Sequence, residues 1–370
     1  MEMFKPFGFD KGLALVTIAL LAVGFIMVFS SSGVLAEQKY NQPMHFLIQQ
    51  IIGALGGLLL AIFILSIRRP FYQSPVAAYG LVGLSAILLA ACFVMPTVAR
   101  VNRWVILGGI RFQPSELAKI SLVLYFAYYL EKKRSRLHEW KTLVLPVAIM
   151  GVFALLILKE PDFGTAFLIC AIGGAMLYIG GARLLHLGFL AAGAGALFAI
   201  YLFSASYRVE RITGFVSTQK DIMGRDFQPY QAKLAIGSGG LLGVSLGEST
   251  QKLDYLPYAH TDFIYAILGE EFGLLGTLTI LVLFIIVLWR GLFVASRAPT
   301  VAGQLTALGL TLVLTVQALL NITVVLGLGP AKGVPLPLVS FGRSSLVCSL
   351  VSVGILLNIS ERRGIERHVR

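Results

Sequence analysis

The 370-residue chain is 57% hydrophobic and only 13% charged, with a mean hydropathy of +0.84. A soluble domain of this length cannot bury so much apolar surface, so the composition excludes one large soluble core. The net charge of +12 would suit nucleic acid, but the basic residues fall mostly in short segments between apolar runs. We therefore attribute the charge to membrane orientation and anionic headgroups, and expect no nucleic-acid partner.

Apolar runs long enough to cross a bilayer, about 20 residues each, recur along the chain. We expect an all-α polytopic membrane protein with about ten transmembrane helices in a single domain, 1–370. The first run has no small-residue cleavage site and is expected to remain as a helix. The expected spans are 12–32, 45–67, 75–95, 115–131, 142–158, 164–181, 184–203, 262–288, 301–327 and 344–359.

Lys and Arg in the short connections predict the orientation. With both termini in the cytoplasm, every expected inner segment carries Lys or Arg, as the positive-inside rule requires. These inner segments are Arg68-Arg69, 132–136, Arg183, 290–297 and the basic tail 362–370. The outer connections are then 33–44, 96–114, 159–163, 204–261 and 328–343.

The segment between the seventh and eighth spans, 204–261, is the expected large extracytoplasmic loop. With Asp262 included, it holds six basic and six acidic residues and is neutral overall. Its piece 230–242 leans apolar and contains Gly237-Ser238-Gly239-Gly240, which predicts a short amphipathic helix on the membrane surface followed by a turn. A structureless loop of this length would be unusual without a function.

Asp262 follows Thr261 at the start of the eighth span. Thr and Asp at a helix start accept hydrogen bonds from free backbone N–H groups, so an N-cap is one interpretation. The other is a general base, because a partly desolvated carboxylate has a raised pKa and can take a proton from an attacking hydroxyl. Spacing alone leaves the two interpretations equally weighted.

Charged residues inside the expected spans form two further groups. Glu270 and Glu271 lie about 12 Å deeper if the helix is regular, and such acids should face the bundle interior or a wet cavity. A structural pair satisfied by Lys or Arg is favoured over catalysis. Glu116 and Lys119 are three residues apart, so they can pair on one helix face, either as architecture or within a substrate groove.

The outer connections carry more cations than the positive-inside rule expects. Each one alone suits solvent or a headgroup, but together they suit phosphate, which guanidinium and ammonium groups bind by charge-assisted hydrogen bonds. A lipid pyrophosphate would match both the charge and the membrane depth. These residues are Arg103, Arg111, Lys159, Arg208, Arg211, Lys332 and Arg343.

Six segments, in this order and at the expected membrane faces, resemble the SEDS family (shape, elongation, division and sporulation proteins). They extend over nearly the whole chain. The matching text is Arg103-Trp104, the run RFQPSELAK at 111–119, EPDFGT at 160–165, QAKLAIGSGG at 231–240, LPYAHTDF at 256–263 and GVPLPLVS at 333–340.

The resemblance implies ten transmembrane helices and a peptidoglycan glycosyltransferase that polymerises lipid II at the outer face of the bacterial cytoplasmic membrane. A divalent cation, Mg²⁺ or Mn²⁺, is implied, as is a class B penicillin-binding protein partner among other division or elongation proteins. The essential acid maps onto Asp262. The residues expected to bind substrate or pyrophosphate are Arg103, Arg111, Glu116, Lys119, Asp162, Lys233, His260, Lys332 and Ser340; metal ligands are unknown.

Within the family, the division branch is favoured over the elongation branch by Gln251-Lys252, Gly269-Glu270-Glu271 and 330–333. Four residues depart from the family pattern: Tyr258, Asp226, Phe341 and Arg343.

The expected mechanism is inverting glycosyl transfer with Asp262 as the base. The alternatives are an elongation polymerase, a lipid II flippase using the charged spans, and a non-enzymatic division scaffold. No inverted repeat or paired broken helices of the transporter kind are evident in the sequence.

Overall fold

The computed structural model describes residues 8–67, 71–95, 102–107, 110–203, 209, 227–253, 256–257, 259–329 and 333–368. Each of the ten expected spans falls on a helix of this part of the chain. The helices are α1 (Lys11–Tyr40), α2 (His45–Ser66), α3 (Pro75–Ala91), α4 (Pro114–Lys132), α5 (Trp140–Lys159), α6 (Phe163–Gly180), α7 (Leu184–Phe203), α10 (Ile264–Ser296), α11 (Val301–Val325) and α12 (Arg343–His368).

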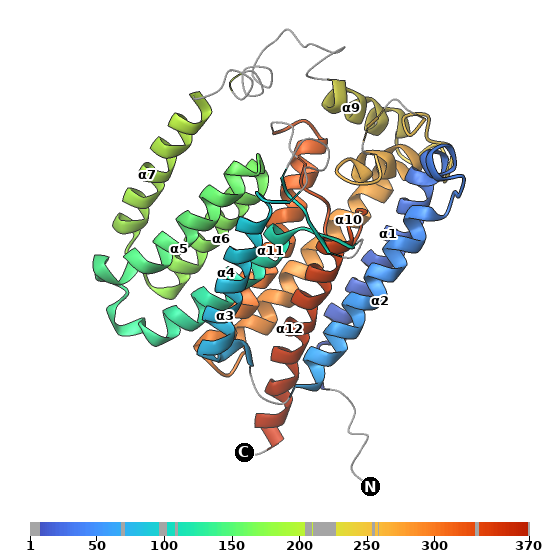
Figure 1. The fold of residues 1–370 in the computed structure, drawn as a ribbon. Helices are drawn as coiled ribbons and strands as arrows, with labels where there is room; N and C mark the ends of the chain where they lie inside the picture. Colours follow the sequence, from blue (N-terminus) through green and yellow to red (C-terminus); the bar gives the residue numbers. More distant parts are fainter. Residues whose placement is uncertain are drawn as a thin grey trace.

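The all-α, multi-pass class is confirmed. Seven of these helices are long and apolar enough to cross a membrane, namely α1, α2, α5, α6, α10, α11 and α12. The apolar helices α3 and α7 are shorter. Helix α4 carries Glu116 and Lys119, yet most of its residues are buried, because it lies among other helices near the middle of the bundle (Figure 1). Its charges are thereby shielded from lipid.

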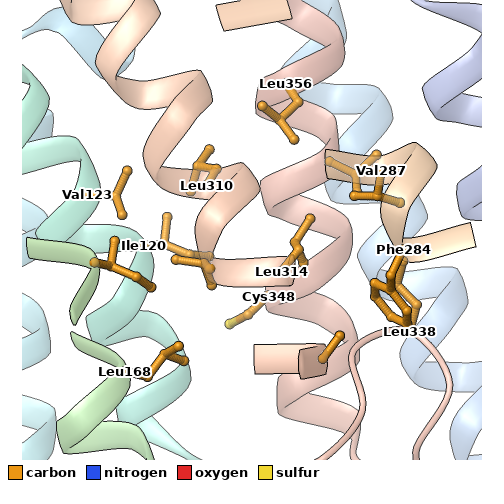
Figure 2. Close-up of a cluster of buried hydrophobic side chains, with 14 of the residues drawn as sticks. Ile120, Val123, Leu168, Phe284, Val287, Leu310, Leu314, Leu338, Cys348 and Leu356 are labelled. Atoms are coloured by element: carbon orange, nitrogen blue, oxygen red, sulfur yellow. The ribbon is translucent and has the colours of Figure 1, made fainter. Parts of the chain in front are cut away.

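The core lies where α4, α10, α11 and α12 face one another. Side chains such as Val123, Leu314 and Leu356 belong to the buried apolar cluster there (Figure 2), and all three are nearly inaccessible to solvent. Small residues permit close helix contacts. A Cβ added to Gly57 of α2 would lie 2.6 Å from a methyl group of Leu350 on α12.

Several element boundaries differ from expectation. Helix α1 continues through 33–40, and α10 continues to Ser296, so Arg290 lies within a helix. Its guanidinium pairs with Asp10, while the Asp10 N–H donates to Ser360 Oγ at 3.0 Å. The start of α1 and the distal part of α12 therefore lie at one end of the bundle, opposite α9 (Figure 1).

The connections that were expected to be outer contain ordered structure. Residues Val105–Leu107 (β1) and Ile110–Phe112 (β2) form an antiparallel pair with Val105 opposite Phe112, which the sequence analysis did not anticipate. The predicted surface helix exists as α9, Phe227–Gly239, and the chain turns immediately after it at Gly240 with φ +55°. Residues 204–208 and 210–226 of the large loop lie outside the described residues, as does Lys332.

Helix α10 is broken at Gly273, which has φ +61° and ψ −156°. The turn after α9 fills the break: Val244 N–H donates to the Glu270 carbonyl at 3.0 Å, and Leu274 N–H donates to the Gly240 carbonyl at 2.9 Å. The backbones meet so closely that a Cβ on Gly243 would lie 2.1 Å from the Glu271 carbonyl oxygen. The break follows Glu270 and Glu271, so the helix that leads to both acids from Ile264 is regular, and the irregularity begins just beyond them.

Candidate functional site

Asp262 is held by its backbone at the start of α10. Its carbonyl accepts a hydrogen bond from Asn321 Nδ2 at 2.8 Å, and the preceding carbonyl, of Thr261, accepts one from Ser340 Oγ at 2.6 Å. The N-cap of α10 is Phe263, with no side-chain cap. The cap interpretation of Asp262 is wrong, so the carboxylate is not used to start the helix.

The Asp262 carboxylate lies directly against Gly333. A Cβ built on Gly333 would come within 2.7 Å of Asp262 Oδ2, so any side chain there would displace the carboxylate or the segment around residue 333. Burial and, to a lesser extent, the negative charge of Asp162 raise the pKa of Asp262, the positive charge of Arg103 lowers it, and the net result is a pKa of about 7. A carboxyl group with this pKa can exchange a proton near neutral pH.

Arg103 and Asp162 come from two different connections between helices. The Arg103 guanidinium donates from Nε to the Glu160 carbonyl at 2.8 Å and from Nη2 to the Pro161 carbonyl at 2.5 Å. Asp162 caps α6, accepting from Thr165 N–H at 3.1 Å and from Thr165 Oγ1 at 2.9 Å. The electrostatic environment of Asp262 is thus fixed by a cation and an anion that are themselves fixed by the backbone.

The Glu160 side chain is fully buried beside this group. Burial and the charge of Asp162 raise its pKa to about 8, although Arg103 lowers it. Glu160 is therefore mostly protonated at neutral pH, so the cluster carries less negative charge than its three acids would suggest. We had not singled out Glu160, although it lies in the EPDFGT motif.

Glu116 and Lys119 form the expected ion pair on α4. Lys119 Nζ lies 2.9 Å from Glu116 Oε1 and donates to Gln317 Oε1 on α11 at 2.5 Å. Both residues are only 3% exposed. An apolar cavity between α4, α5, α6 and α11 reaches Lys119 and is otherwise lined by residues such as Phe126 and Met176. The predicted substrate contact of this pair stays a prediction.

The other predicted binding residues take varied positions. Burial and the charge of Lys39 lower the pKa of His260 to about 4, so its ring is neutral, and it packs against Phe46 and Phe341 at 4.7 and 5.7 Å between centroids. Ser340 is buried and donates a hydrogen bond to the Thr261 carbonyl. Arg111 on β2 and Lys233 on α9 are exposed.

Glu270 and Glu271 hold the large loop against α10. Glu270 accepts from Ser249 Oγ at 2.5 Å and from the N–H and Oγ1 of Thr250, each at 3.0 Å. Glu271 pairs with Lys252 at 2.9 Å and accepts from Ser30 Oγ on α1 at 2.5 Å. The favoured structural interpretation is thus supported, with the partner Lys on the loop and not on a helix.

The described residues do not form a ready-made metal site. No group of three or more His, Cys, Asp or Glu side chains among them lies close enough to hold a metal ion. Mg²⁺ is often bound by one or two carboxylates together with substrate phosphates, so a cation at this site would depend on oxygens that the substrate supplies.

The sequence did not lead us to predict two residues of the site, Gln317 and Asn321. Both are amides inside an apolar span, four residues apart and on one face of α11. The available signal was that polar groups within a span are expensive and tend to face the bundle interior. Their contacts, unlike their burial, depend on residues more than a dozen positions away.

Together, the fold and this site define a polytopic helical membrane protein with a cluster of charged side chains assembled from the connections between its helices. Residues 11–364 match the FtsW/RodA/SpoVE family model, described as cell cycle proteins. The chain belongs to that family, which is the SEDS family.

Individual relatives match along nearly their full length. A probable peptidoglycan glycosyltransferase FtsW from Trichlorobacter lovleyi is 39% identical, with 96% of this chain and 95% of the relative covered. Stage V sporulation protein E of Bacillus subtilis is 36% identical, with 95% and 96% covered. The similarity to several FtsW sequences agrees with the predicted division branch.

Solved structures share the fold. A chain from a peptidoglycan synthase complex that coordinates polymerization and crosslinking has a TM-score of 0.78 and 27% identity, with 96% of this chain and 98% of that chain covered. The rod shape determining protein RodA of Thermus thermophilus has a TM-score of 0.70 and 28% identity, with 96% and 97% covered.

Proposed function

We propose that this chain is a peptidoglycan glycosyltransferase that polymerises lipid II during septal cell division. The observation that carries the proposal is the environment of Asp262. Its carboxyl group has a pKa of about 7, lies just before the start of α10 and is not used as a helix cap. The names of the FtsW relatives support the same reaction.

In the proposed reaction, Asp262 takes the proton from the GlcNAc 4-hydroxyl of one lipid II molecule. The oxygen attacks C1 of the MurNAc of the other with inversion, so a C–O bond forms to C1 while the bond from C1 to the pyrophosphate oxygen breaks. The leaving undecaprenyl pyrophosphate takes the electron pair. Arg103 and Arg111 are the proposed cations for its charge, because preorganised donors stabilise charge that develops in the transition state.

The proposed setting is the bacterial cytoplasmic membrane, with the site outside and both termini in the cytoplasm. The basic inner segments support this orientation. A class B penicillin-binding protein is the proposed partner, supported by the likeness to a chain of a complex that joins polymerization to crosslinking. Lipid II is the proposed substrate, and its soluble disaccharide-pentapeptide would meet Asp262 at the membrane surface.

Polymerisation and flipping are separated by an assay in detergent. Purified chain with its partner is expected to convert lipid II into glycan strands, resolved by gel electrophoresis, although no sealed bilayer is present. Absence of strands would contradict the polymerase. The flippase alternative receives no support from Glu270 and Glu271, because loop groups occupy both carboxylates. In the native cell, depletion should give filaments for a division role and rounded cells for an elongation role.

The rate of strand synthesis is expected to rise with pH through a midpoint near 7. The base is active when deprotonated, and Asp262 loses its proton around that pH. Asp162→Asn removes a repelling charge and should move the midpoint to lower pH, whereas Arg103→Ala should move it higher. Initial rates between pH 5.5 and 9.5 measure this.

Glu160→Gln is the matched control for the pH profile, since Glu160 is buried nearby but is not among the groups that shift Asp262. Its midpoint should stay near 7. A profile that is flat through neutral pH, or one that moves with Glu160 and not with Asp162, would contradict Asp262 as the titrating base.

A divalent cation, Mg²⁺ or Mn²⁺, is proposed to enter with the pyrophosphate and to be held mainly by its oxygens. When bound, it would neutralise charge on the leaving group. Chelation with EDTA is expected to slow strand synthesis, and an excess of Mg²⁺ or Mn²⁺ to restore it. A rate that EDTA leaves unchanged would remove the cation from the proposal.

A further inference from the structure

Two buried amides on α11, Gln317 and Asn321, connect parts of the site that are far apart in the sequence. Each is 2% exposed. An amide that is buried in an apolar setting without hydrogen bonds is destabilising. Their positions are therefore explained by the groups that they bind.

Asn321 uses its amide nitrogen on two carbonyls. Nδ2 donates to the Asp262 carbonyl at 2.8 Å and to the Val334 carbonyl at 2.7 Å. One side chain thus ties the residue that bears the proposed base to the segment whose Gly333 lies against its carboxylate. Any shift of Asp262 or of the segment around Gly333 and Val334 would change the space around Asp262 Oδ2.

Gln317 binds the same segment one residue further on. Its Nε2 donates to the Pro335 carbonyl at 2.9 Å, while Oε1 accepts from Lys119 at 2.5 Å. An ammonium group only donates and a carbonyl only accepts, so Lys119 and Pro335 together allow one orientation of the Gln317 amide. Glu116 in turn holds Lys119 at 2.9 Å.

The Asn321 oxygen gives a second, independent indication. Oδ1 is buried and has no hydrogen-bond partner in the described part of the chain. Buried polar atoms are nearly always paired, and exceptions concentrate where an arrangement serves something other than stability. Here the Asn321 amide nitrogen binds the Asp262 and Val334 carbonyls, and the amide oxygen is left without a partner.

We propose that Gln317 and Asn321 are positioning residues, which hold Asp262 and the 333–335 segment at the spacing that proton abstraction requires. Glu116 and Lys119 then act through Gln317, by fixing its amide, and need not touch the pyrophosphate. This inference rests on the proposed polymerase function and adds to it the means by which the base is aimed.

The test compares Asn321→Leu with Thr323→Val in the full chain with its partner. Leu has the branching of Asn, with two methyl groups in place of the amide oxygen and nitrogen, and has no donor. The Thr323 hydroxyl, by contrast, donates within α11, to the Leu320 carbonyl at 3.0 Å. Asn321→Leu is expected to lower kcat about 10²-fold, the effect of a misplacement of about 1 Å, with KM for lipid II nearly unchanged. Thr323→Val should keep both parameters.

Melting temperature in detergent, measured on the same samples, separates positioning from folding. Wild-type kcat in Asn321→Leu, or a loss that appears mainly in KM, would overturn the proposal. If Asn321→Leu does not fold, Gln317→Glu takes its place: it keeps an acceptor for Lys119 but loses the donor to Pro335, and the same selective loss of kcat is expected, with an unchanged kcat overturning the proposal. If the wild type makes no strands at all, the polymerase function fails instead.

Discussion

Asp262→Asn is expected to lower the rate of strand synthesis about 10²–10⁴-fold, the range over which a positioned general base acts. An amide has nearly the shape of the carboxylate but cannot take the proton of the attacking hydroxyl. Rates should be compared at pH 8, where most of the wild-type Asp262 is deprotonated, given its pKa of about 7. The loss should appear in kcat, because the exchange removes the proton acceptor and leaves the neighbouring side chains in place.

The fold of the Asp262→Asn variant should survive. The groups that hold position 262 are backbone carbonyls, bound by Asn321 and Ser340, and the side chain does not cap α10. Burial disfavours the charged carboxylate, so a neutral amide removes an electrostatic cost. The melting temperature should therefore equal or exceed that of the wild type, and a large decrease would assign Asp262 a structural role.

Glu248→Gln is the matched control for this experiment. Glu248 is an exposed acid of the same large loop, so the exchange removes the same charge without touching the site. Its rate should remain close to that of the wild type. Strand synthesis near the wild-type rate in Asp262→Asn, or an equal loss in Glu248→Gln, would remove Asp262 as the base.

The helices could be predicted from the sequence because apolar length alone decides them in a membrane. Their ends could not, since a polar residue does not end a helix: α1 continues through Lys39, and α10 continues past Arg290. The break at Gly273 could not be predicted from the sequence either. It depends on the Gly240–Gly243 turn entering the helix, a tertiary contact with no local signal.

The site shows the same division between local and long-range information. The motif around Asp262 drew attention to this residue, but its pKa depends on its burial and on Asp162 and Arg103, which belong to two other connections. His260 lies within the same motif and was predicted to bind substrate, a prediction that stays untested. Its packing against Phe46 and Phe341 could be found only from the structure.

Glu116→Gln is expected to lower the free energy of unfolding by about 3–5 kcal/mol, because removing one member of a buried ion pair leaves the other charge without its counterion. Lys119 would keep its neutral partner Gln317, which places the effect toward the lower end of that range. Thermal or denaturant unfolding of the purified chain in detergent measures the change. The control is Glu139→Gln, an exposed acid before α5, which should have little effect.

The double variant Glu116→Met, Lys119→Met decides between two roles for the pair. Replacing a buried ion pair by apolar residues of similar size is often neutral or stabilising, so the double variant should regain most of the stability that Glu116→Gln loses. If Lys119 bound pyrophosphate directly, this stable variant would show a raised KM for lipid II. Because the Gln317 amide is oriented by Lys119, we expect instead a lowered kcat and a nearly unchanged KM. A raised KM at unchanged kcat would indicate that Lys119 binds the substrate directly.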